Sequence, residues 1–308
     1  MSYKYDANLL DADSLIWKAG SLSEKKVWYV YRDDEEVEQF DMKSDLNKWL
    51  KDEHSLSSRK FSKTVEDDGT EIHTLDDWRL EGIPKLEPLS HCLQLLKVQI
   101  NGIMKKSLAK KTWLYVSTGR NYRYEIYPRY KESRANTPKP KYYYDMLDYL
   151  MDKYDVVDSK VIEADDAVCI AYNEMKANGI SAVISHIDKD IEQLPGNHYN
   201  WDWELVVGKD AHYKVSKMEG RRSFFMQMLT GDSADSIPGI KGVGKATALK
   251  MLGSITELDE YIHKVQDAYA QAWPDEDHEA YFERNALLLF MLREPYTGIE
   301  NIDWRKWV

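Results

Sequence analysis

The sequence contains few cysteines and no long apolar run, and both features exclude classes of protein. Cys92 and Cys169 are the two cysteines of the 308 residues, too few for a disulfide framework, so a reduced, cytoplasmic setting is expected. No window approaches the roughly 18 consecutive apolar residues of a membrane span. The first residues lack the basic-then-apolar layout of a secretory signal, and no membrane partner is expected.

An excess of basic residues is also missing. Lys and Arg number 42 against 53 Asp and Glu, which gives a formal net charge of −11. This charge argues against a nucleic-acid partner, unless the acidic residues gather where metal ions neutralise them. Apolar residues make up 43% of the chain, which is typical of a globular protein.

Short apolar runs alternate with helical patterns along the chain. Runs such as "NLLD", "TWLYVS" and "SAVIS" predict buried strands, whereas Leu89 to Lys106, Tyr142 to Tyr154 and Glu163 to Gly179 have helical spacing. This alternation predicts an α/β fold with a mainly parallel central sheet flanked by helices. The chain after Lys217 is expected to be mostly helical.

Three segments do not follow this alternation. "KVWYVY" and "EVEQFD" predict a hairpin around "RDDE". The polar stretch from Asp52 to Glu81, with "EDDGTE" as a loop, is expected to be a surface excursion. "WELVV" and "HYKVS" are expected to pair as strands.

Carboxylates gather at the ends of the expected elements. Asp11 and Asp13 follow one strand, and further acidic clusters contain Glu163, Asp165 and Asp166, then Asp188 and Asp190, then Asp232 and Asp235. Each cluster alone is explained by helix capping and solvated loops. Sites in open α/β sheets form just beyond the carboxyl ends of strands, so the set of clusters favours one shared site. Oxygen-only ligands suit Mg²⁺ or Mn²⁺, and a pair of such ions can clamp a phosphodiester.

Two basic stretches are candidates for phosphate contact. In "GRNYRYEIYPRYKESR", tyrosines that suit base stacking alternate with the basic residues Arg120, Arg123, Arg129, Lys131 and Arg134, although each tyrosine alone is better explained by packing. "GIKGVGKAT" approaches a nucleotide phosphate loop, but Ala246 stands where that loop needs Ser or Thr. A helix-hairpin-helix at about 229–253 that grips DNA is the better interpretation, with these contacts: Gly239, Lys241, Gly242, Gly244 and Lys245.

The chain resembles the 5′-nuclease family, which includes flap endonucleases, the 5′-nuclease domain of DNA polymerase I and bacteriophage 5′–3′ exonucleases. The motifs "RYEIYPRYKESR", "VIEADDAV", "SHIDKDIEQL" and "LTGDSADSIPGIKGVGKATALKML" occur in the order of that family. A chain of this length without a polymerase looks most like the bacteriophage enzymes, which would place it in the cytoplasm of a host cell. The resemblance implies hydrolysis of DNA at a 5′ end or 5′ flap with two Mg²⁺ or Mn²⁺ ions.

The resemblance also implies roles for individual residues. It implies a first metal site of Asp11, Glu163, Asp165 and Asp166, and a second of Asp188, Asp190, Asp232 and Asp235. Arg120 and Arg123 fall where the family has a basic pair at the scissile phosphate, and Lys131 and Arg134 would contact DNA nearby. A helical arch is implied near 134–160, within a nuclease core at 1–217 that precedes a helical region at 218–308. The helix-hairpin-helix turn of this family also binds a potassium ion.

Two departures from the family pattern limit these implications. Ser117 stands where the family usually has an Asp, which supports an alternative: a catalytically impaired DNA-binding protein of the same fold. Residues 20–88 have no counterpart in the family and receive no role.

A nucleotide hydrolase remains a third candidate for the function, and Ala246 argues against it. His186 is expected to pack or hydrogen-bond, not to bind a metal ion.

Overall fold

The structure is a computed structural model that describes residues 3–66, 68–135, 137–274 and 276–308. The chain forms two compact units, Met1–Leu15 with Gln99–Pro138 and Leu150–Val308, and Ile16–Val98 with Lys139–Tyr149. The residues between α1 (Asp13–Ser23) and α3 (Leu89–Lys106) build a sheet of their own, and the domain boundary expected near residue 217 stays a prediction.

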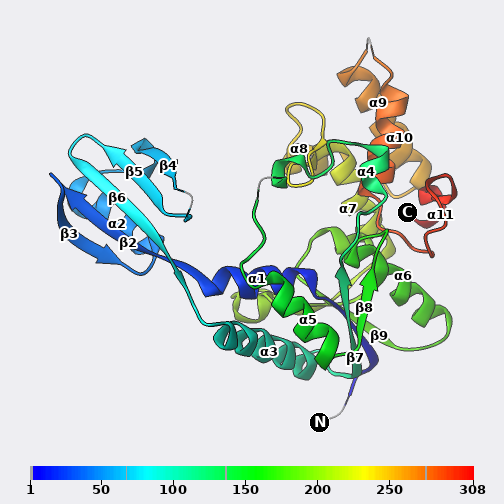
Figure 1. Ribbon diagram of the computed structural model, residues 1–308. Coiled ribbons are helices and arrows are strands. Elements are labelled where there is room, and N and C mark those ends of the chain that lie inside the picture. The colour runs from blue at the N-terminus through cyan, green and yellow to red at the C-terminus, as the bar shows by residue number, and fades with distance from the viewer. Residues whose placement is uncertain (1–2, 67, 136, 275) are drawn as a thin grey trace. The chain divides into compact units, whose positions relative to one another are not determined.

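A six-stranded sheet forms the centre of the first unit (Figure 1). Its strand order is β11-β10-β9-β1-β7-β8, and the only antiparallel pair among these described strands is β10–β11. The expected α/β fold with a mainly parallel sheet is therefore confirmed. The strands are β1 (Tyr5–Asp11), β7 (Ala109–Ser117), β8 (Val156–Ser159), β9 (Ala182–His186), β10 (Gly196–Asn200) and β11 (His212–Val215).

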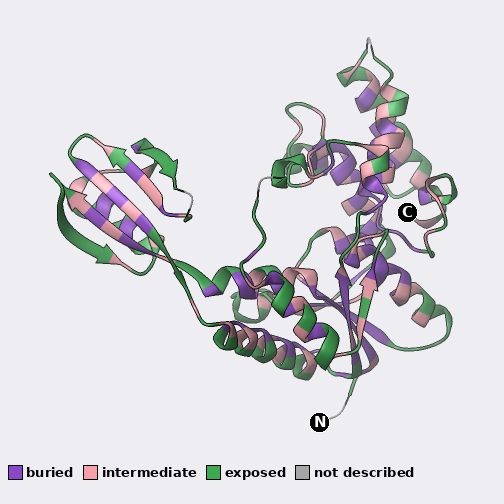
Figure 2. Ribbon diagram, viewed as in Figure 1, coloured by how far each residue is buried: buried purple, intermediate pink, exposed green. Residues whose placement is uncertain are grey.

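The apolar runs of the sequence form the inner strands of this sheet. Leu9, Leu10 and Ile184 are fully buried, and buried residues continue along these strands in Figure 2. Strands buried on both faces lack the polar–apolar alternation of half-exposed ones. Asp11 pairs with Tyr115 near the end of β7, so the carboxyl ends of β1 and β7 reach the same edge of the sheet.

Helices complete the first unit. Helix α6 (Ala164–Ala177) packs against β1, β7 and β9, and α4 (Arg123–Ile126) follows β7. After α7 (Lys217–Thr230), which a Ser216–Glu219 capping box begins, the chain is mostly helical as expected. The later elements are β12 (Gly231–Asp232), β13 (Ile237–Pro238), α8 (Lys245–Leu252), α9 (Leu258–Ala272), α10 (His278–Leu289) and α11 (Trp304–Trp307). None of the helices among the described residues combines the length and apolarity that crossing a bilayer requires.

The second unit contains a five-stranded antiparallel sheet that the sequence only partly predicts. Its order is β3-β2-β6-β5-β4, and α2 (Lys43–His54) packs against β2 and β3. The expected hairpin forms as β2 (Glu24–Arg32) and β3 (Glu35–Phe40). The stretch between Asp52 and Glu81, expected to be a surface excursion, instead contains three strands of this sheet, β4 (Ser62–Val65), β5 (Glu71–Leu75) and the start of β6 (Trp78–Leu86). Asp67 of the "EDDGTE" loop lies outside the described residues.

Packing on one face explains this inserted sheet. Trp28, Val30, Trp78 and Leu80 form a core with Leu46 and other residues of and around α2. Along β6 the buried residues alternate with partly exposed ones from Trp78 to Gly82 (Figure 2). Part of each of three helices belongs to this unit: α1 (Asp13–Ser23), α3 (Leu89–Lys106) and α5 (Tyr143–Lys153).

The structure contradicts one further expectation, the strand at "WELVV", and does not test another, the helical arch. "WELVV" does not pair as a strand: Trp203–Leu205 is a 3₁₀ turn, and β11 pairs with β10 instead. The segment 134–160 contains α5 and β8, and the helical arch there stays a prediction. Asn136 of that segment lies outside the described residues.

The carboxylate of Glu71, in the inserted sheet, lies within ion-pair distance of several basic side chains. Its carboxylate lies 2.9 Å from Lys26, 3.1 Å from Lys63 and 3.1 Å from the His73 ring. Burial opposes ionisation, but these contacts outweigh it and hold the pKa of Glu71 well below its usual range. A carboxyl with a lowered folded pKa stabilises the fold above its unfolded pKa, and this stabilisation is lost as the pH falls.

Glu71→Gln is therefore expected to lower the stability of this unit by about 1–2 kcal/mol at pH 7. The difference from wild type should shrink as the pH falls below about 4, where the unfolded carboxyl is protonated. Thermal melts followed by tryptophan fluorescence at pH 7 and pH 3 measure it, because Trp28 and Trp78 lie in this core. A difference that does not change with pH would contradict the assigned role of Glu71.

Candidate metal and nucleic-acid site

A pocket of about 110 Å³ lies in the first unit and is lined mainly by charged side chains. Six acidic residues and three basic residues contribute to it: Glu163, Asp165, Asp188, Asp190, Asp232 and Asp235, with Lys131, Arg134 and Lys189. These residues come from segments far apart in the sequence, and most of them lie where a strand ends or a helix begins. The pocket brings together both of the metal sites that the resemblance implies, except for Asp11 and Asp166.

Local sequence signals position the acidic residues at the start of α6. Glu163 is the N-cap residue, and it forms a capping box with Asp166, so backbone geometry fixes both side chains. Glu163 accepts hydrogen bonds from Lys131 and, at 2.8 Å, from the Tyr130 hydroxyl. Burial disfavours its charge, but Lys131 and Arg123 lower the pKa of Glu163. Asp165 is its neighbour, and burial together with the Glu163 charge raises the pKa of Asp165.

The loop after β9 and the turn between β12 and β13 supply the other carboxylates. Asp188 accepts the Asp190 N–H at 2.8 Å, and Asp190 accepts the Gln227 amide at 2.5 Å. Burial, with the nearby Asp188 charge, raises the pKa of Asp190 to about 7. Asp232 lies 2.9 Å from the Lys189 ammonium and is held by the Ala234 N–H at 2.8 Å.

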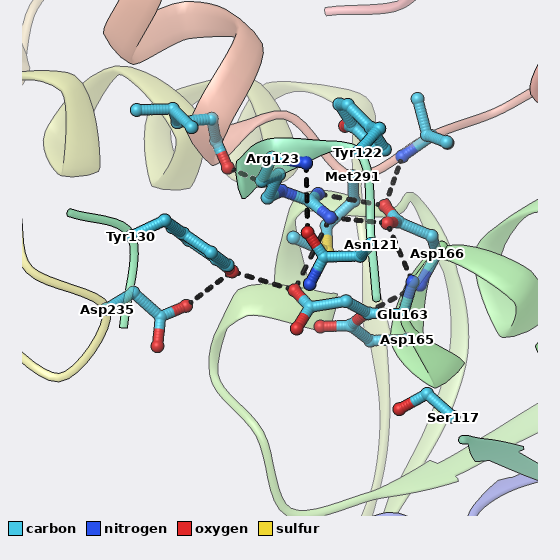
Figure 3. A network of polar contacts seen from close by, with 12 residues as sticks. Ser117, Asn121, Tyr122, Arg123, Tyr130, Glu163, Asp165, Asp166, Asp235 and Met291 are labelled. Carbon is cyan, nitrogen blue, oxygen red and sulfur yellow. Dashed lines mark hydrogen bonds and ion pairs between the residues drawn. The ribbon is translucent and has the colours of Figure 1, made fainter. Parts of the chain in front are cut away.

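Tyr130 connects the two groups of carboxylates. Its hydroxyl lies 2.8 Å from Glu163 and 2.9 Å from Asp235 (Figure 3). Asp235 also lies 3.0 Å from the Arg134 guanidinium. A hydroxyl has one proton, so it can donate to only one of the two carboxylates. The other carboxylate therefore contacts the hydroxyl oxygen without receiving its proton.

Asp11 lies at the end of β1, deeply buried and near Asp188. Burial, then the charges of Asp13 and Asp188, raises the pKa of Asp11 to about 8. Asp13, which the metal-site assignment omitted, accepts the Ser117 N–H at 3.1 Å and the Ser117 hydroxyl. Ser117 thus holds a carboxylate at the strand end where the family usually has its own Asp.

Arg123 and Asp166, which the resemblance implies as a phosphate contact and a metal ligand, pair with each other and do not line the pocket. Arg123 is fully buried, and its guanidinium forms a bidentate pair with Asp166 at 2.5 and 3.0 Å. It also donates to the carbonyls of Leu288 at 2.8 Å and Phe290 at 2.9 Å. Asp166 is fully buried as well and accepts the Leu292 N–H at 3.0 Å. With all these partners, Arg123 has no surface for a phosphate and Asp166 none for a metal ion.

The basic residues of the pocket differ from the expected pair. Arg120 is exposed and its guanidinium lies over the Tyr124 ring at 5.1 Å, and it does not line the pocket. Lys131 and Arg134, expected to contact DNA, instead reach the carboxylates Glu163 and Asp235. Lys189 was not singled out from the sequence, although its position between Asp188 and Asp190 is a signal that places it here.

His186 has the structural role that the sequence predicts. It is buried and contacts the Asp188 carbonyl at 2.6 Å and the His198 ring at 2.9 Å. His198 in turn contacts the Leu194 carbonyl at 2.8 Å. Two neutral rings carry two N–H groups for these three contacts, so one contact lacks a proton. Burial lowers the pKa of both rings, His186 to about 3 and His198 to about 4.

The glycine-rich turn lies between β13 and α8. Gly242 has φ +82°, which favours glycine, whereas Gly244 has φ −95° and is the N-cap residue of α8. A Cβ on Gly239 would lie 2.1 Å from the Thr230 carbonyl carbon, so this glycine permits β12 and β13 to pair. Lys241 and Lys245 are exposed beside the turn.

The carboxylate pocket suits a cation by its chemistry. All its acidic ligands are oxygen donors, and acidic side chains outnumber basic ones. Burial, and after it the charges of neighbouring carboxylates, raises the pKa values of Asp11 and Asp190. Across the described parts of the chain, however, no three Asp, Glu, His or Cys side chains are already arranged to coordinate a metal ion. Lys131 and Lys189 pair with the carboxylates in this arrangement.

Comparisons with known proteins support the resemblance. No protein-family model matches the chain. Flap endonuclease Xni of Shewanella baltica (strain OS155) is 31% identical over 144 residues, which cover 45% of this chain and 55% of that protein. DNA polymerase I of Chloroflexus aurantiacus is 24% identical over 163 residues, 49% of this chain and 17% of the polymerase. The crystal structure of the T5 D15 protein with metal ions aligns with 64% of this chain and 80% of its own, at 16% identity and a TM-score of 0.49.

The expected resemblance to flap endonucleases and DNA polymerase I is confirmed by these relatives. The chain spans about half the length of the first and less than a fifth of the second. The narrower likeness to bacteriophage exonucleases stays a prediction.

Proposed function

We propose that this chain, related over about half its length to flap endonuclease Xni and DNA polymerase I, is a metal-dependent 5′ nuclease of DNA. The observation that carries the proposal is the pocket in which six carboxylates meet three basic side chains. Carboxylates suit divalent ions, and basic side chains suit the phosphate of the substrate. The T5 D15 protein was co-crystallized with metal ions, and one further complex of it contains DNA.

Two Mg²⁺ or Mn²⁺ ions are the proposed cofactors. Glu163, Asp165 and Asp11 would hold the first ion, and Asp188, Asp190, Asp232 and Asp235 the second, some of them through water. Bound there, such ions lower the pKa of a coordinated water and stabilise the leaving 3′-oxygen. Asp166 is left out of the ligand set because Arg123 and backbone N–H groups occupy its oxygens.

The chain's own basic residues would bind and orient the substrate. Lys131 and Arg134 point among the carboxylates, so we assign them, in place of Arg120 and Arg123, to the scissile phosphate. Lys131 pairs with the Glu163 carboxylate in this structure. A substrate phosphate beside Lys131 would replace that carboxylate as its anionic partner. Arg134 can donate two parallel hydrogen bonds to phosphate oxygens.

The turn between β13 and α8 would bind the duplex part of the substrate through backbone N–H groups, with Lys241 and Lys245 beside them. A potassium ion at this turn belongs to the same proposal. Gly244→Val is expected to weaken duplex binding about tenfold, because its side chain would block the approach of a phosphate. Lys245→Ala should reduce the slope of log affinity against log salt by about 0.9.

The backbone of Gly244 makes this test selective. Its φ is negative and an added Cβ would meet nothing, so Gly244→Val should cost only the weaker N-cap preference of valine, about 0.5–1 kcal/mol. Gly242→Val is the matched control, because its positive φ makes any side chain there strained and should lower stability. Fluorescence anisotropy on duplex DNA at two salt concentrations, beside thermal melts, measures both effects. Normal duplex affinity in Gly244→Val would remove the turn from the DNA interface.

A catalytically impaired DNA-binding protein is the second candidate, and Ser117 is the observation that favours it. Cleavage of a 5′-labelled flap duplex with Mg²⁺, with Mn²⁺ and after chelation tests the proposal. We expect cleavage with either ion and none after chelation. Duplex binding without cleavage in any of these conditions would favour the impaired protein, and ATP turnover would favour a nucleotide hydrolase.

A further inference from the structure

Two segments far apart in the sequence are joined by hydrogen bonds beside the carboxylate pocket. The Lys131 N–H donates to the Asp235 carbonyl at 2.9 Å. The Ser133 N–H donates to the Ser236 hydroxyl at 2.9 Å, and the Ser133 hydroxyl donates to the Ala234 carbonyl at 2.7 Å. We call these three hydrogen bonds the clasp. The clasp fixes the main chain around Lys131 against the turn between β12 and β13.

The clasp holds two residues that have an unusual backbone conformation. Lys131 has φ +56° and Ser236 has φ +59°, in the left-handed region that residues other than glycine rarely adopt. This conformation is unfavourable for a residue with a Cβ, and it persists only where surrounding contacts impose it. The clasp provides such contacts, because it engages the Lys131 N–H and the Ser236 hydroxyl. Without the clasp, the main chain at Lys131 should relax toward an ordinary conformation.

The main chain of this stretch determines which side chains reach the pocket. The Lys131 side chain is 23% exposed, and its ammonium pairs with the Glu163 carboxylate. The Tyr130 hydroxyl lies 2.9 Å from the Asp235 carboxylate (Figure 3). The Arg134 guanidinium lies 3.0 Å from the same carboxylate. A change of φ at Lys131 would turn its side chain away from this position, so the ammonium would leave Glu163.

We infer that Ser133 and Ser236 are positioning residues for the reaction: through the clasp they keep the Lys131 ammonium among the carboxylates. Neither serine lines the carboxylate pocket, so both act through Lys131 and not on the reacting atoms. The inference rests on the proposed function, because Lys131 is assigned there to the scissile phosphate. It adds the residues that determine where that ammonium lies.

Four variants separate the clasp from the fold around it. Ser236→Gly removes the hydroxyl, and glycine adopts a positive φ without strain. Ser133→Ala removes the other hydroxyl and keeps the N–H. Ser236→Asn is the conservative variant, because asparagine tolerates this backbone conformation and its side-chain oxygen can accept the Ser133 N–H. Ser233→Ala is the matched control, since Ser233 is an exposed serine of the same turn outside the clasp.

The reactivity of the Lys131 amine is the first readout, and it requires no cleavage. Each protein is acylated in chelator with an N-hydroxysuccinimide ester, and the modified lysines are quantified by peptide mass spectrometry. Lys131 should react about three- to tenfold faster in Ser236→Gly and Ser133→Ala, the factor that the loss of one hydrogen bond corresponds to. Ser236→Asn and Ser233→Ala should react at close to the wild-type rate. Lys214, an exposed lysine of β11, is the internal reference.

The rate of cleavage of a flap duplex in Mg²⁺ is the second readout. Ser236→Gly should lower kcat about tenfold and change KM less than about twofold, because the displaced ammonium stabilises charge that grows in the transition state. Ser236→Asn should keep most of the wild-type kcat. The melting temperature of Ser236→Gly should stay close to that of wild type, because relief of the unfavourable φ offsets the lost hydrogen bond.

The two readouts distinguish the inference from its alternatives. Unchanged acylation of Lys131 in Ser236→Gly would overturn the inference at any rate of cleavage. Faster acylation of Lys131 and Lys214 together, with a lower melting temperature, would make the clasp purely structural and would also overturn it. So would selective acylation of Lys131 with an unchanged kcat. Absence of cleavage by wild type would remove the proposed function, whereas selective acylation would still support the positioning of Lys131 by Ser236.

Discussion

Asp165→Asn is expected to reduce metal-dependent cleavage at least ~10²–10³-fold while duplex binding is retained. The substitution keeps the size of the side chain and removes one negative charge from the pocket. Because burial and the Glu163 charge raise the pKa of Asp165, the neutral amide should fit the metal-free fold at least as well as the carboxylate. The variant should therefore melt at or slightly above the wild-type temperature.

The rate of cleavage of a 5′-labelled flap duplex in Mg²⁺, with duplex affinity measured in parallel, checks this expectation. Asp267→Asn is the control, since Asp267 is an exposed carboxylate on α9 and does not line the pocket. Cleavage at the wild-type rate by Asp165→Asn would remove Asp165 from the metal ligands. A loss of duplex binding as large as the loss of cleavage would instead indicate a damaged fold.

Arg123→Met should destabilise the first unit by about 3–5 kcal/mol, because it leaves the buried Asp166 carboxylate without its partner. It also removes the hydrogen bonds to the carbonyls of Leu288 and Phe290, which join α4 to the end of α10. Loss of cleavage would follow from loss of the fold. Urea denaturation measures the free energy of unfolding.

Two variants separate this role from direct contact with the substrate. Arg120→Met should change stability by less than about 0.5 kcal/mol, because Arg120 is exposed. The double variant Arg123→Met with Asp166→Leu should recover part of the loss, because it leaves no unpaired buried charge. If Arg123→Met is as stable as wild type and fails only in cleavage, Arg123 contacts the reacting phosphate after all.

The mainly parallel central sheet was predictable from sequence, because its inner strands β1, β7 and β9 are short apolar runs with mostly buried residues. The inserted sheet was not, since β4 is exposed along its whole length and β5 is only partly buried. The alternation of Trp78, Leu80 and Gly82 in β6 was the available signal. It was obscured by the charged residues Arg79 and Glu81, which occupy the other face.

The sequence predicted the residues of the pocket only in part as well. Acidic residues at element ends predicted that carboxylates would converge, and Glu163, Asp165, Asp190 and Asp235 do line one pocket. Spacing could not distinguish Asp165 from Asp166, because the difference comes from Arg123 and from backbone groups near residue 290, far along the chain. Nor could it show that Lys131 turns inward while Arg120 stays exposed.

The central claim is that the carboxylate pocket cleaves DNA from the 5′ end with divalent ions. Mapping the products of a flap duplex labelled at the 5′ end in one sample and at the 3′ end in another tests it most directly. With Mg²⁺ we expect the 5′ label to be released in short fragments or as an intact flap, and the 3′-labelled strand to shorten from its 5′ side. Loss of nucleotides from the 3′ end, or cleavage that persists after chelation, would contradict the account.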